Sequence, residues 1–303
     1  MDVYGCIEAG GTKFVCGVGT GPDDLATVSL PTVSPEATVA SVARYFQGAG
    51  ARLKAVGIGS FGPLDLDPHS PTFGYITSTP KRGWRQFDLA GAVGRALGAP
   101  VAIDTDVNAA AVGEARWGAA RGLSDFLYLT VGTGIGGGAM ANGAVVHGLT
   151  HPEMGHIRIP HDPAADPYPG GCPYHGDCLE GLASGPAIEA RWGKPAQELP
   201  AGHPAWALEA RYIGLGLANW VCTLSPRRIV IGGGVFQQAQ LFPLVRAELG
   251  RILNGYVQAR AVLEDVDSYV VPPGLGNRAG VLGALALAAG IEPPPLTPHF
   301  HVR

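Results

Sequence analysis

Four side chains of the kinds that bind soft metal ions lie within one short stretch of the sequence: His156, Cys172, His175 and Cys178. The two cysteines and the histidine between them have the spacing C-x2-H-x2-C. Two thiolates and two imidazoles make a closed four-ligand set for Zn²⁺, with no open position for catalysis by the metal. We therefore predict a structural zinc site. Two alternatives stay open: His161 as the fourth ligand, or two ordinary buried thiols without a metal.

The segment that carries this cluster includes "RIPHDPAADPYPGG", which is rich in proline and glycine. Such a segment buries little apolar surface, so a bound metal would supply order that packing cannot. The setting "IPHDP" favours a surface turn at His161. We expect a zinc-binding insert over residues 151–181.

Three glycine clusters mark sharp turns, and each follows a short apolar run: "EAGGTKF" (8–14), "TVGTGIGGGAMANG" (130–143) and "IVIGGGVF" (229–236). The preceding runs contain the β-branched and aromatic residues of buried strands, so each cluster is expected at a strand end. Glycine lets the backbone approach a ligand closely at such a point.

Two known phosphate motifs do not fit these clusters. A Walker loop needs G-K-[ST], whereas the order here is Gly10, Gly11, Thr12 and Lys13. The segment "GTGIGG" satisfies G-x-G-x-x-G, but the Asn142-Gly143 pair that follows indicates a hairpin rather than the helix of a dinucleotide fold.

The first two clusters still suit phosphate groups. Backbone N–H groups of residues 10–12 and of Gly132 to Gly134 could point at phosphoryl oxygens. Thr12 and Thr133 would add hydroxyl donors, and Lys13 would add a cation. The simpler alternative is a pair of tight hairpins without a ligand.

Acidic residues follow two of the expected strands. Asp106 in "AIDTDVNAAA" lies where a buried strand ends and a helix begins, and an ionised carboxylate there could accept a proton from a hydroxyl that attacks a phosphoryl group. The alternative for Asp106 is a helix N-cap, and Asp104 is expected to be structural. Glu8, beside the first glycine loop, could hold a Mg²⁺-bound water or could be a half-exposed strand carboxylate.

The elements that position these residues form two similar patterns. Strands are expected near 3–9, 12–19, 25–33, 53–60 and 100–105, with helices near 36–48 and 87–97 and from about 107. A second strand meander begins after a polar boundary at 117–125, followed by helices near 185–193, 204–224 and 238–255, with strands at "RRIVIGG" and "SYVVP". Strands alternating with helices predict α/β architecture.

Composition narrows the class of protein. The chain has 303 residues, which suggests two domains or one large α/β body. A net charge of −4 without a Lys/Arg run gives no reason to expect nucleic acid as a partner. We expect no membrane segment and no signal peptide, hence a cytoplasmic protein. The five scattered cysteines favour free thiols or metal ligands over disulfides.

Taken together, the motifs resemble the ROK family of sugar kinases. The resemblance rests on "EAGGTK", "DTDVNAAAVGE", "GTGIGGG", "PEMGH", "CPYHGDCLEGLASGPA" and "IVIGGGVF", which occur in family order over nearly the whole chain. It implies an actin-like (ribonuclease H-like) ATPase fold, with two similar lobes around a cleft and the zinc-bearing insert in the second lobe. We place the first lobe at 1–118, joined by a C-terminal helix at about 279–303, and the second lobe at 119–278.

The resemblance also implies an activity, the phosphorylation of a hexose by Mg-ATP with Asp106 as general base. The segments "SFGPLDLDP" and "GYITSTPKRGW", and Thr105 before Asp106, resemble the bacterial fructokinase subgroup. Fructose is therefore the expected sugar, with glucose, mannose or N-acetylmannosamine as alternatives. Glu8 departs from the family, in which many members have Asp.

Residue roles follow from the same resemblance. The sugar would contact Asn108, Glu153, His156 and Glu180, two of them carboxylates that the zinc site would hold in place. Adenosine would lie against Gly232, Gly233 and Gly234, with Pro186 as a wall of the adenine pocket or simply a proline in a first helical turn.

The remaining expectations concern the oligomeric state and the other classes of protein to which the chain could belong. We expect a homodimer. A repressor is disfavoured because no helix-turn-helix segment precedes residue 1. A nonenzymatic sugar sensor and an oxidoreductase built on "GTGIGG" are the remaining alternatives from other classes of protein.

Overall fold

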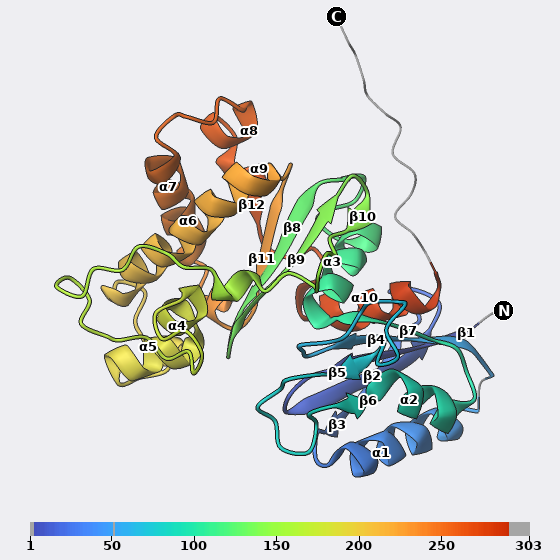
Figure 1. Cartoon of the computed structure of the whole chain (residues 1–303). Coiled ribbons are helices and arrows are strands. Elements are labelled where there is room, and N and C mark those ends of the chain that lie inside the picture. The colour runs from blue at the N-terminus through green and yellow to red at the C-terminus, as the bar shows by residue number, and fades with distance from the viewer. Residues whose placement is uncertain (1–2, 51, 291–303) are drawn as a thin grey trace, which may run out of the picture. The chain divides into compact units, whose positions relative to one another are not determined.

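The computed structural model describes residues 3–50 and 52–290, and the chain divides into two α/β units (Figure 1). Unit 1 comprises residues up to 124, residues 143–152 and residues from 274 onward. Unit 2 comprises residues 125–142 and 153–273. The chain has two five-stranded sheets, one in unit 1 and one mostly in unit 2.

The sheet of unit 1 has the strand order β3-β2-β1-β4-β7. The first three strands form an antiparallel meander, and β4 and β7 run parallel to β1. Their bounds are β1 Val3–Ala9, β2 Lys13–Gly19, β3 Ala26–Pro31, β4 Leu53–Ser60 and β7 Val101–Thr105. The short strands β5 Tyr75–Ile76 and β6 Phe87–Asp88 pair separately.

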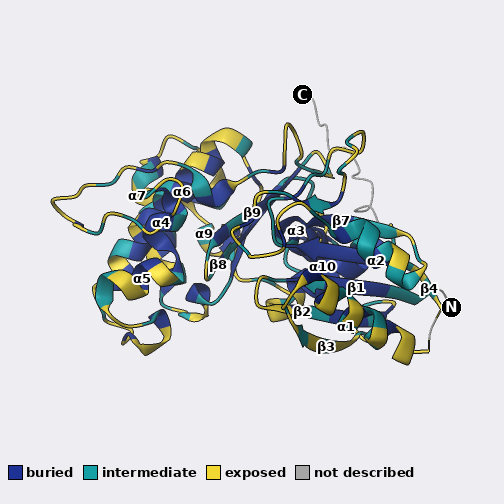
Figure 2. Ribbon diagram, turned by 60° about the horizontal axis from the view of Figure 1, so that its bottom comes forward, coloured by how far each residue is buried: buried dark blue, intermediate teal, exposed yellow. Residues whose placement is uncertain are grey.

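Helices cover both faces of this sheet. Ile7 and Ile58 belong to a core that includes residues of α1 (Pro35–Gly48) and α2 (Leu89–Leu97). Cys6, the neighbour of Ile7, instead packs against α10 (Ala279–Ala288). Figure 2 shows dark blue strands between these helices, with exposed residues along the outer side of α1.

Glycines allow α10 to lie against the sheet and against α3 (Asp106–Trp117). A Cβ atom added at Gly57 would lie 1.8 Å from the carbonyl oxygen of Ala284. One added at Gly283 would lie 1.7 Å from the carbonyl oxygen of Ala109. Larger residues would push the backbones apart, so these two glycines allow α10 to pack closely on β4 and on α3.

Unit 2 contains most of a second sheet with the order β10-β9-β8-β11-β12. Its strands are β8 Phe126–Val131, β9 Ile135–Ala141, β10 Ala144–Val145, β11 Ile229–Gly232 and β12 Val270–Val271. Its helices are α4 Leu179–Ala183, α5 Gly185–Trp192, α6 Ala205–Leu224, α7 Leu241–Leu253, α8 Arg260–Leu263 and α9 Val266–Tyr269. Short 3-10 turns occur at Met154–His156, Ala196–Glu198, Val235–Gln237 and Gly276–Arg278.

The expected α/β class is confirmed, and most elements lie within a few residues of their predicted bounds. The pair β5 and β6 and the short helices α4, α8 and α9 were not predicted. The C-terminal helix was expected over about 279–303; it ends at Ala288, and residues 291–303 lie outside the described residues.

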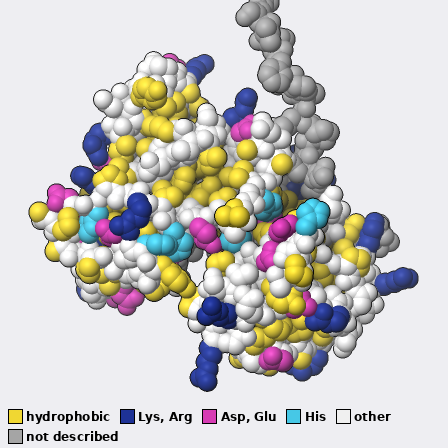
Figure 3. Space-filling view, in the orientation of Figure 1, with side chains coloured by type: hydrophobic (Ala, Val, Ile, Leu, Met, Phe, Trp, Pro, Cys, Tyr) yellow, Lys and Arg dark blue, Asp and Glu magenta, His cyan; other side chains and the backbone are white. Residues whose placement is uncertain are grey.

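The hydropathy of the helices and the distribution of basic side chains describe the surface of the protein. Within residues 3–50 and 52–290, no helix is both long and apolar enough to cross a membrane. On the face shown in Figure 3, Lys and Arg side chains are scattered rather than gathered into a patch.

Candidate active site and metal centre

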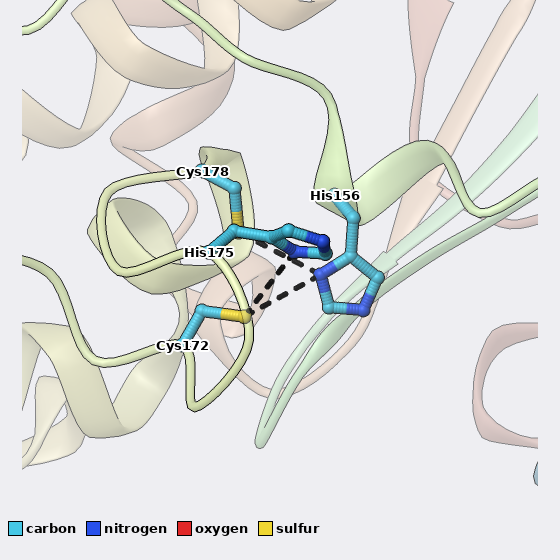
Figure 4. Close-up of side chains that lie close together, drawn as sticks. All are labelled: His156, Cys172, His175 and Cys178. Carbon is cyan, nitrogen blue, oxygen red and sulfur yellow. Dashed lines mark hydrogen bonds between the residues drawn. The ribbon is translucent and has the colours of Figure 1, made fainter. Parts of the chain in front are cut away.

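The four predicted metal ligands lie together in unit 2. One ligand atom from each of His156, Cys172, His175 and Cys178 lies within 4.8 Å of all the others. The Nδ1 atom of His156 is 3.7 Å from Sγ of Cys172 and 3.6 Å from Sγ of Cys178, and Nδ1 of His175 is 3.6 Å from Sγ of Cys172 (Figure 4).

These separations fit a tetrahedral Zn²⁺ site. With Zn–N bonds of about 2.0 Å and Zn–S bonds of about 2.3 Å, neighbouring ligand atoms should be about 3.5 Å apart. Burial raises the pKa of the Cys178 thiol to about 11, so metal binding would release a proton near neutral pH. The geometry therefore supports a closed site that could hold zinc.

The chain around the cluster is held by close backbone contacts. Isolated β-bridges pair Arg158 with Cys178 and Cys172 with Gly176. Gly170 has φ of +89°, and a Cβ atom there would lie 2.2 Å from the carbonyl oxygen of Gly176. Glycine is required at Gly170 because both its conformation and its surroundings exclude a side chain.

His156 reaches the cluster from a 3-10 turn that packs on β9. A Cβ atom on Gly155 would lie only 1.8 Å from the carbonyl oxygen of Ile135, so the motif "EMGH" needs glycine to bring His156 this close. Its other ring nitrogen, Nε2, is 3.9 Å from Oε1 of Glu180. The carboxylate of Glu180 therefore lies near the ring nitrogen of His156 that does not face the thiols.

Among the expected sugar residues of unit 2, His156 and Glu180 are therefore neighbours. Glu180 lies in α4, two residues after Cys178, and its Oε2 atom accepts a hydrogen bond of 2.9 Å from the amide of Ile135. Glu153 is exposed and precedes the 3-10 turn that carries His156.

His161 is not part of the cluster, which decides between the two candidates for the fourth ligand. Its Nδ1 atom is 3.3 Å from a carboxylate oxygen of Asp177, and its Nε2 atom is 3.0 Å from the carbonyl oxygen of Asp166. The side chain of His161 is only 6% exposed, and the surface turn lies directly after it, over the exposed residues 162–165. His161 itself helps to attach the insert.

A buried polar network anchors the same insert. Asp166 accepts hydrogen bonds from Nε of Arg191 at 3.0 Å and from the hydroxyl of Tyr212 at 2.6 Å. Arg191 also donates to the carbonyl oxygen of Leu182 at 2.9 Å. The insert is thus attached to α5 and α6 without a metal, which the sequence analysis did not anticipate.

The glycine segments of unit 2 that we expected to bind the nucleotide lie next to one another. The carbonyl oxygen of Gly132 accepts a hydrogen bond of 2.7 Å from the amide of Gly185, the residue before Pro186 at the start of α5. Gly233 has φ of +93°, and a Cβ atom there would lie 2.3 Å from the carbonyl oxygen of Val131. Thr133 is exposed at the tip of the β8–β9 turn.

The first glycine loop forms the β1–β2 turn of unit 1. The amide of Gly10 donates to the carbonyl oxygen of Lys13 at 2.9 Å, and Gly11, Thr12 and Lys13 are exposed. Glu8 is half-buried on β1, and burial raises the pKa of its carboxyl group although Lys13 lowers it.

Asp106 is the first residue of α3, but it is not the N-cap. The capping residue is Thr105, whose hydroxyl accepts a hydrogen bond of 3.1 Å from the amide of Asn108. Asp106 is half-buried, and its Oδ1 atom accepts from the amide of Val107 at 2.9 Å. The capping alternative for Asp106 is therefore excluded.

Asn108, expected to contact the sugar, lies in the first turn of α3, and Asp104 lies near the end of β7, the strand that precedes this helix. The Nδ2 atom of Asn108 donates to Oδ1 of Asp104 at 2.7 Å. His147 approaches the same carboxylate, with its Nε2 atom 3.0 Å from Oδ2. His147 was not predicted from the sequence. The three histidines in "AVVHGLTHPEMGH" were the signal that could have pointed to it.

Comparison with known sequences finds one matching family, described as the ROK family, over residues 4–291. A fructokinase of Zymomonas mobilis subsp. mobilis is 45% identical over 301 residues, covering 96% of this chain and 97% of its own. A fructokinase of Pediococcus pentosaceus is 42% identical over 287 residues, covering 94% and 97%. A glucokinase of Streptomyces coelicolor is 30% identical over 329 residues, covering 96% and 98%.

Solved structures show the same fold. A ROK hexokinase from Thermus thermophilus matches with a TM-score of 0.75 at 31% identity, covering 95% of this chain and 98% of its own. A ROK family glucokinase from Streptomyces griseus, solved in complex with glucose and AMPPNP, matches with a TM-score of 0.73 at 28% identity, covering 95% and 100%.

Proposed function

We propose that this chain, which belongs to the ROK family, is a fructokinase that transfers the γ-phosphoryl group of ATP to the 6-hydroxyl of D-fructose. The observation that carries the proposal is that this chain has a higher sequence identity to fructokinases than to a glucokinase of the same family. Fructokinases match at 42% and 45% identity over nearly their whole length, whereas the glucokinase of Streptomyces coelicolor matches at 30%.

Asp106 is assigned as the general base. A carboxylate at the start of α3 is held by the helix and does not have to cap it, since Thr105 does so. An ionised carboxylate at this position can serve as a proton acceptor. It can then accept the proton of the sugar hydroxyl as the oxygen attacks phosphorus.

The nucleotide is assigned to glycine-rich backbone. In unit 2, Gly132 to Gly134, Pro186 and Gly232 to Gly234 form adjoining segments where a base and ribose could lie against main chain. In unit 1, Gly11 and Thr12 offer amides to the phosphates, the amide of Gly10 closes the turn on Lys13, and the side chain of Lys13 offers a positive charge. Mg²⁺ would neutralise phosphate charge, and Glu8 is the residue that we assign to hold one of its waters.

The sugar is assigned to Asn108, Glu153, His156 and Glu180. Carboxylate and amide oxygens accept hydrogen bonds from hydroxyl groups, and phosphoryl transfer depends on holding the reacting hydroxyl in line. The zinc cluster supports this role, because His156 and the segment before Glu180 are tied to it. We assign zinc to His156, Cys172, His175 and Cys178 as a structural ion.

The test is ADP formation with Mg-ATP across fructose, glucose, mannose and N-acetylmannosamine, with the phosphorylated position identified by NMR. We expect the highest kcat/KM with fructose and a phosphate on carbon 6. A higher kcat/KM for glucose would make the protein a glucokinase of the same family. Sugar binding without ADP formation would support a nonenzymatic sensor and contradict the proposal.

A further inference from the structure

A buried carboxylate in unit 1 collects three hydrogen-bond donors. Asp104 is 5% exposed, and its Oδ1 atom accepts from the amide of Thr105 at 2.7 Å and from Nδ2 of Asn108 at 2.7 Å. The Nε2 atom of His147 lies 3.0 Å from Oδ2 and 3.3 Å from Oδ1. His147 follows β10 and is 43 residues away in sequence.

This arrangement fixes which way the amide of Asn108 points. A carboxylate oxygen only accepts, so Asn108 must present its NH₂ group to Asp104. Its carbonyl oxygen then points elsewhere, and this Oδ1 atom is buried with no hydrogen-bond partner among the described residues. Asn108 as a whole is 1% exposed. A buried acceptor left without a donor is unfavourable, and a ligand hydroxyl that donates to it would remove that cost.

His147 completes the arrangement from the other side of the carboxylate. Nε2 of His147 is also 3.4 Å from Nδ2 of Asn108. Since Nδ2 is a donor and Nε2 lies at hydrogen-bond distance from Asp104, both nitrogens converge on the carboxylate rather than on each other. The hydrogen bond that His147 donates to Asp104 also raises the pKa of His147, as expected for a ring beside a carboxylate.

We propose that His147 is a positioning residue for the sugar: it holds Asp104, which in turn orients the Asn108 amide so that Oδ1 accepts a hydrogen bond from a fructose hydroxyl. This inference rests on the proposed function and adds a residue to it. His147 acts through Asp104, so its effect should fall on sugar binding more than on the transfer of the phosphoryl group.

The test compares His147→Leu, which removes the donor, with His147→Gln, whose amide can still donate to Asp104. For His147→Leu we expect the fructose KM to rise about tenfold, as for the loss of one hydrogen bond to a charged group. The KM for ATP should stay within about twofold and kcat should fall less than the fructose KM rises. His147→Gln should restore most of the fructose affinity. His69→Leu, an exposed histidine in the same unit, is the matched control and should change none of these values.

A second variant changes Asp104 and leaves His147 intact, so it tests the contact between Asp104 and Asn108 directly. Asp104→Asn keeps the size of the side chain but can turn an NH₂ group toward Asn108, so the Asn108 amide should flip and lose its free acceptor. Its fructose KM should rise at least as much as that of His147→Leu, with zinc content and circular dichroism used to confirm folding.

Different results would contradict the role of His147 and the fructokinase assignment. An unchanged fructose KM in a folded His147→Leu protein, or equal defects in the Leu and Gln variants, would overturn the role of His147 and leave the fructokinase assignment standing. A wild-type protein that forms no ADP with any hexose would overturn the fructokinase assignment, and with it this role.

Discussion

Oε2 of Glu180 accepts a hydrogen bond of 2.9 Å from the backbone amide of Ile135, the residue that follows the glycine turn of β8 and β9. Glu180 belongs to α4, immediately beyond the metal cluster, and its other carboxylate oxygen faces His156. One side chain therefore connects the segment that carries the proposed zinc ligands to the turn that we assign to the nucleotide.

Removing this connection should weaken both substrates. In Glu180→Ala we expect the fructose KM to rise by about tenfold or more and the KM for ATP to rise about threefold to tenfold, because the carboxylate is lost from the sugar and the turn loses its anchor. Steady-state kinetics with each substrate varied in turn would measure this. An unchanged KM for ATP would show that the turn keeps its conformation without Glu180.

Two glycines of the same turn provide a matched pair. A Cβ atom at Gly134 would lie 2.6 Å from Oε2 of Glu180, whereas one at Gly132 would come no closer than 3.8 Å to the amide nitrogen of Gly234. Gly134→Ala should therefore displace Glu180 and reproduce much of the Glu180→Ala defect, and Gly132→Ala should have a smaller effect. Equal defects in both variants would show that loss of glycine flexibility, not displacement of Glu180, is the cause.

Asp106→Asn should separate catalysis from stability. Asparagine keeps the shape of the side chain but cannot accept the proton, so we expect kcat to fall by about 10² or more while fructose affinity is retained. The melting temperature should change little because Thr105 caps the helix.

Thr105→Ala is the complementary variant, since it removes the cap and leaves the carboxylate. It should cost about 1 kcal/mol of stability with a smaller loss of kcat than Asp106→Asn. Calorimetry and turnover measured on both variants would check the separation. Near wild-type turnover in folded Asp106→Asn would remove Asp106 from the mechanism.

Much of this architecture could be predicted from the sequence because its signals are local. The strands β1, β8 and β11 are apolar runs that end in glycines, and their neighbours in sequence determine where they stop. The metal cluster could be predicted for a similar reason, since three of its four residues lie within one short loop and few other functions require that combination.

The features that could not be predicted from the sequence depend on contacts between residues far apart in the chain. His147 meets Asp104 across 43 residues, and Tyr212 meets Asp166 across 46, so no short pattern connects either pair. Local ambiguity limited another prediction: Thr105 and Asp106 are both good N-cap residues, and only the observed hydrogen bond to Asn108 shows which one caps α3.

Removing the metal should disturb only part of the insert. In the chelated protein or in Cys178→Ser, residues 171–179 should lose protection from hydrogen exchange first, because they would lose the metal that links them to His156. The segment around Asp166 should stay protected because Arg191 and Tyr212 hold it independently. We expect the fructose KM to rise more than the KM for ATP, with both restored by zinc.

His161→Gln is the control for this experiment, because His161 lies in the same insert but outside the cluster. It should retain zinc in full by metal analysis. A stoichiometric loss of zinc in His161→Gln would contradict the ligand set, and an unchanged fructose KM after complete chelation would contradict the proposed purpose of the metal.

The Asp166 network should contribute stability that depends on pH in a defined direction. Burial alone would raise the pKa of Asp166, but hydrogen bonds from Tyr212 and Arg191 outweigh it and hold the pKa below its usual value. A carboxyl group with a lowered folded-state pKa stabilises the protein above its unfolded pKa of about 3.9, and this contribution is lost as the pH falls through the folded-state value.

Asp166→Asn removes that charge and leaves Arg191, 8% exposed, without its carboxylate. Removing one partner of a buried ion pair costs about 3 kcal/mol, which for a chain of this size corresponds to a decrease in melting temperature of roughly 6 °C at neutral pH. The gap between wild type and Asp166→Asn should be constant from about pH 5 to 8 and should narrow below about pH 4, where the wild-type carboxylate becomes protonated. Comparing the two proteins at each pH by calorimetry cancels the loss of metal ligands that both share. A gap that stays constant below pH 4 would show that Asp166 contributes through shape and not through its charge.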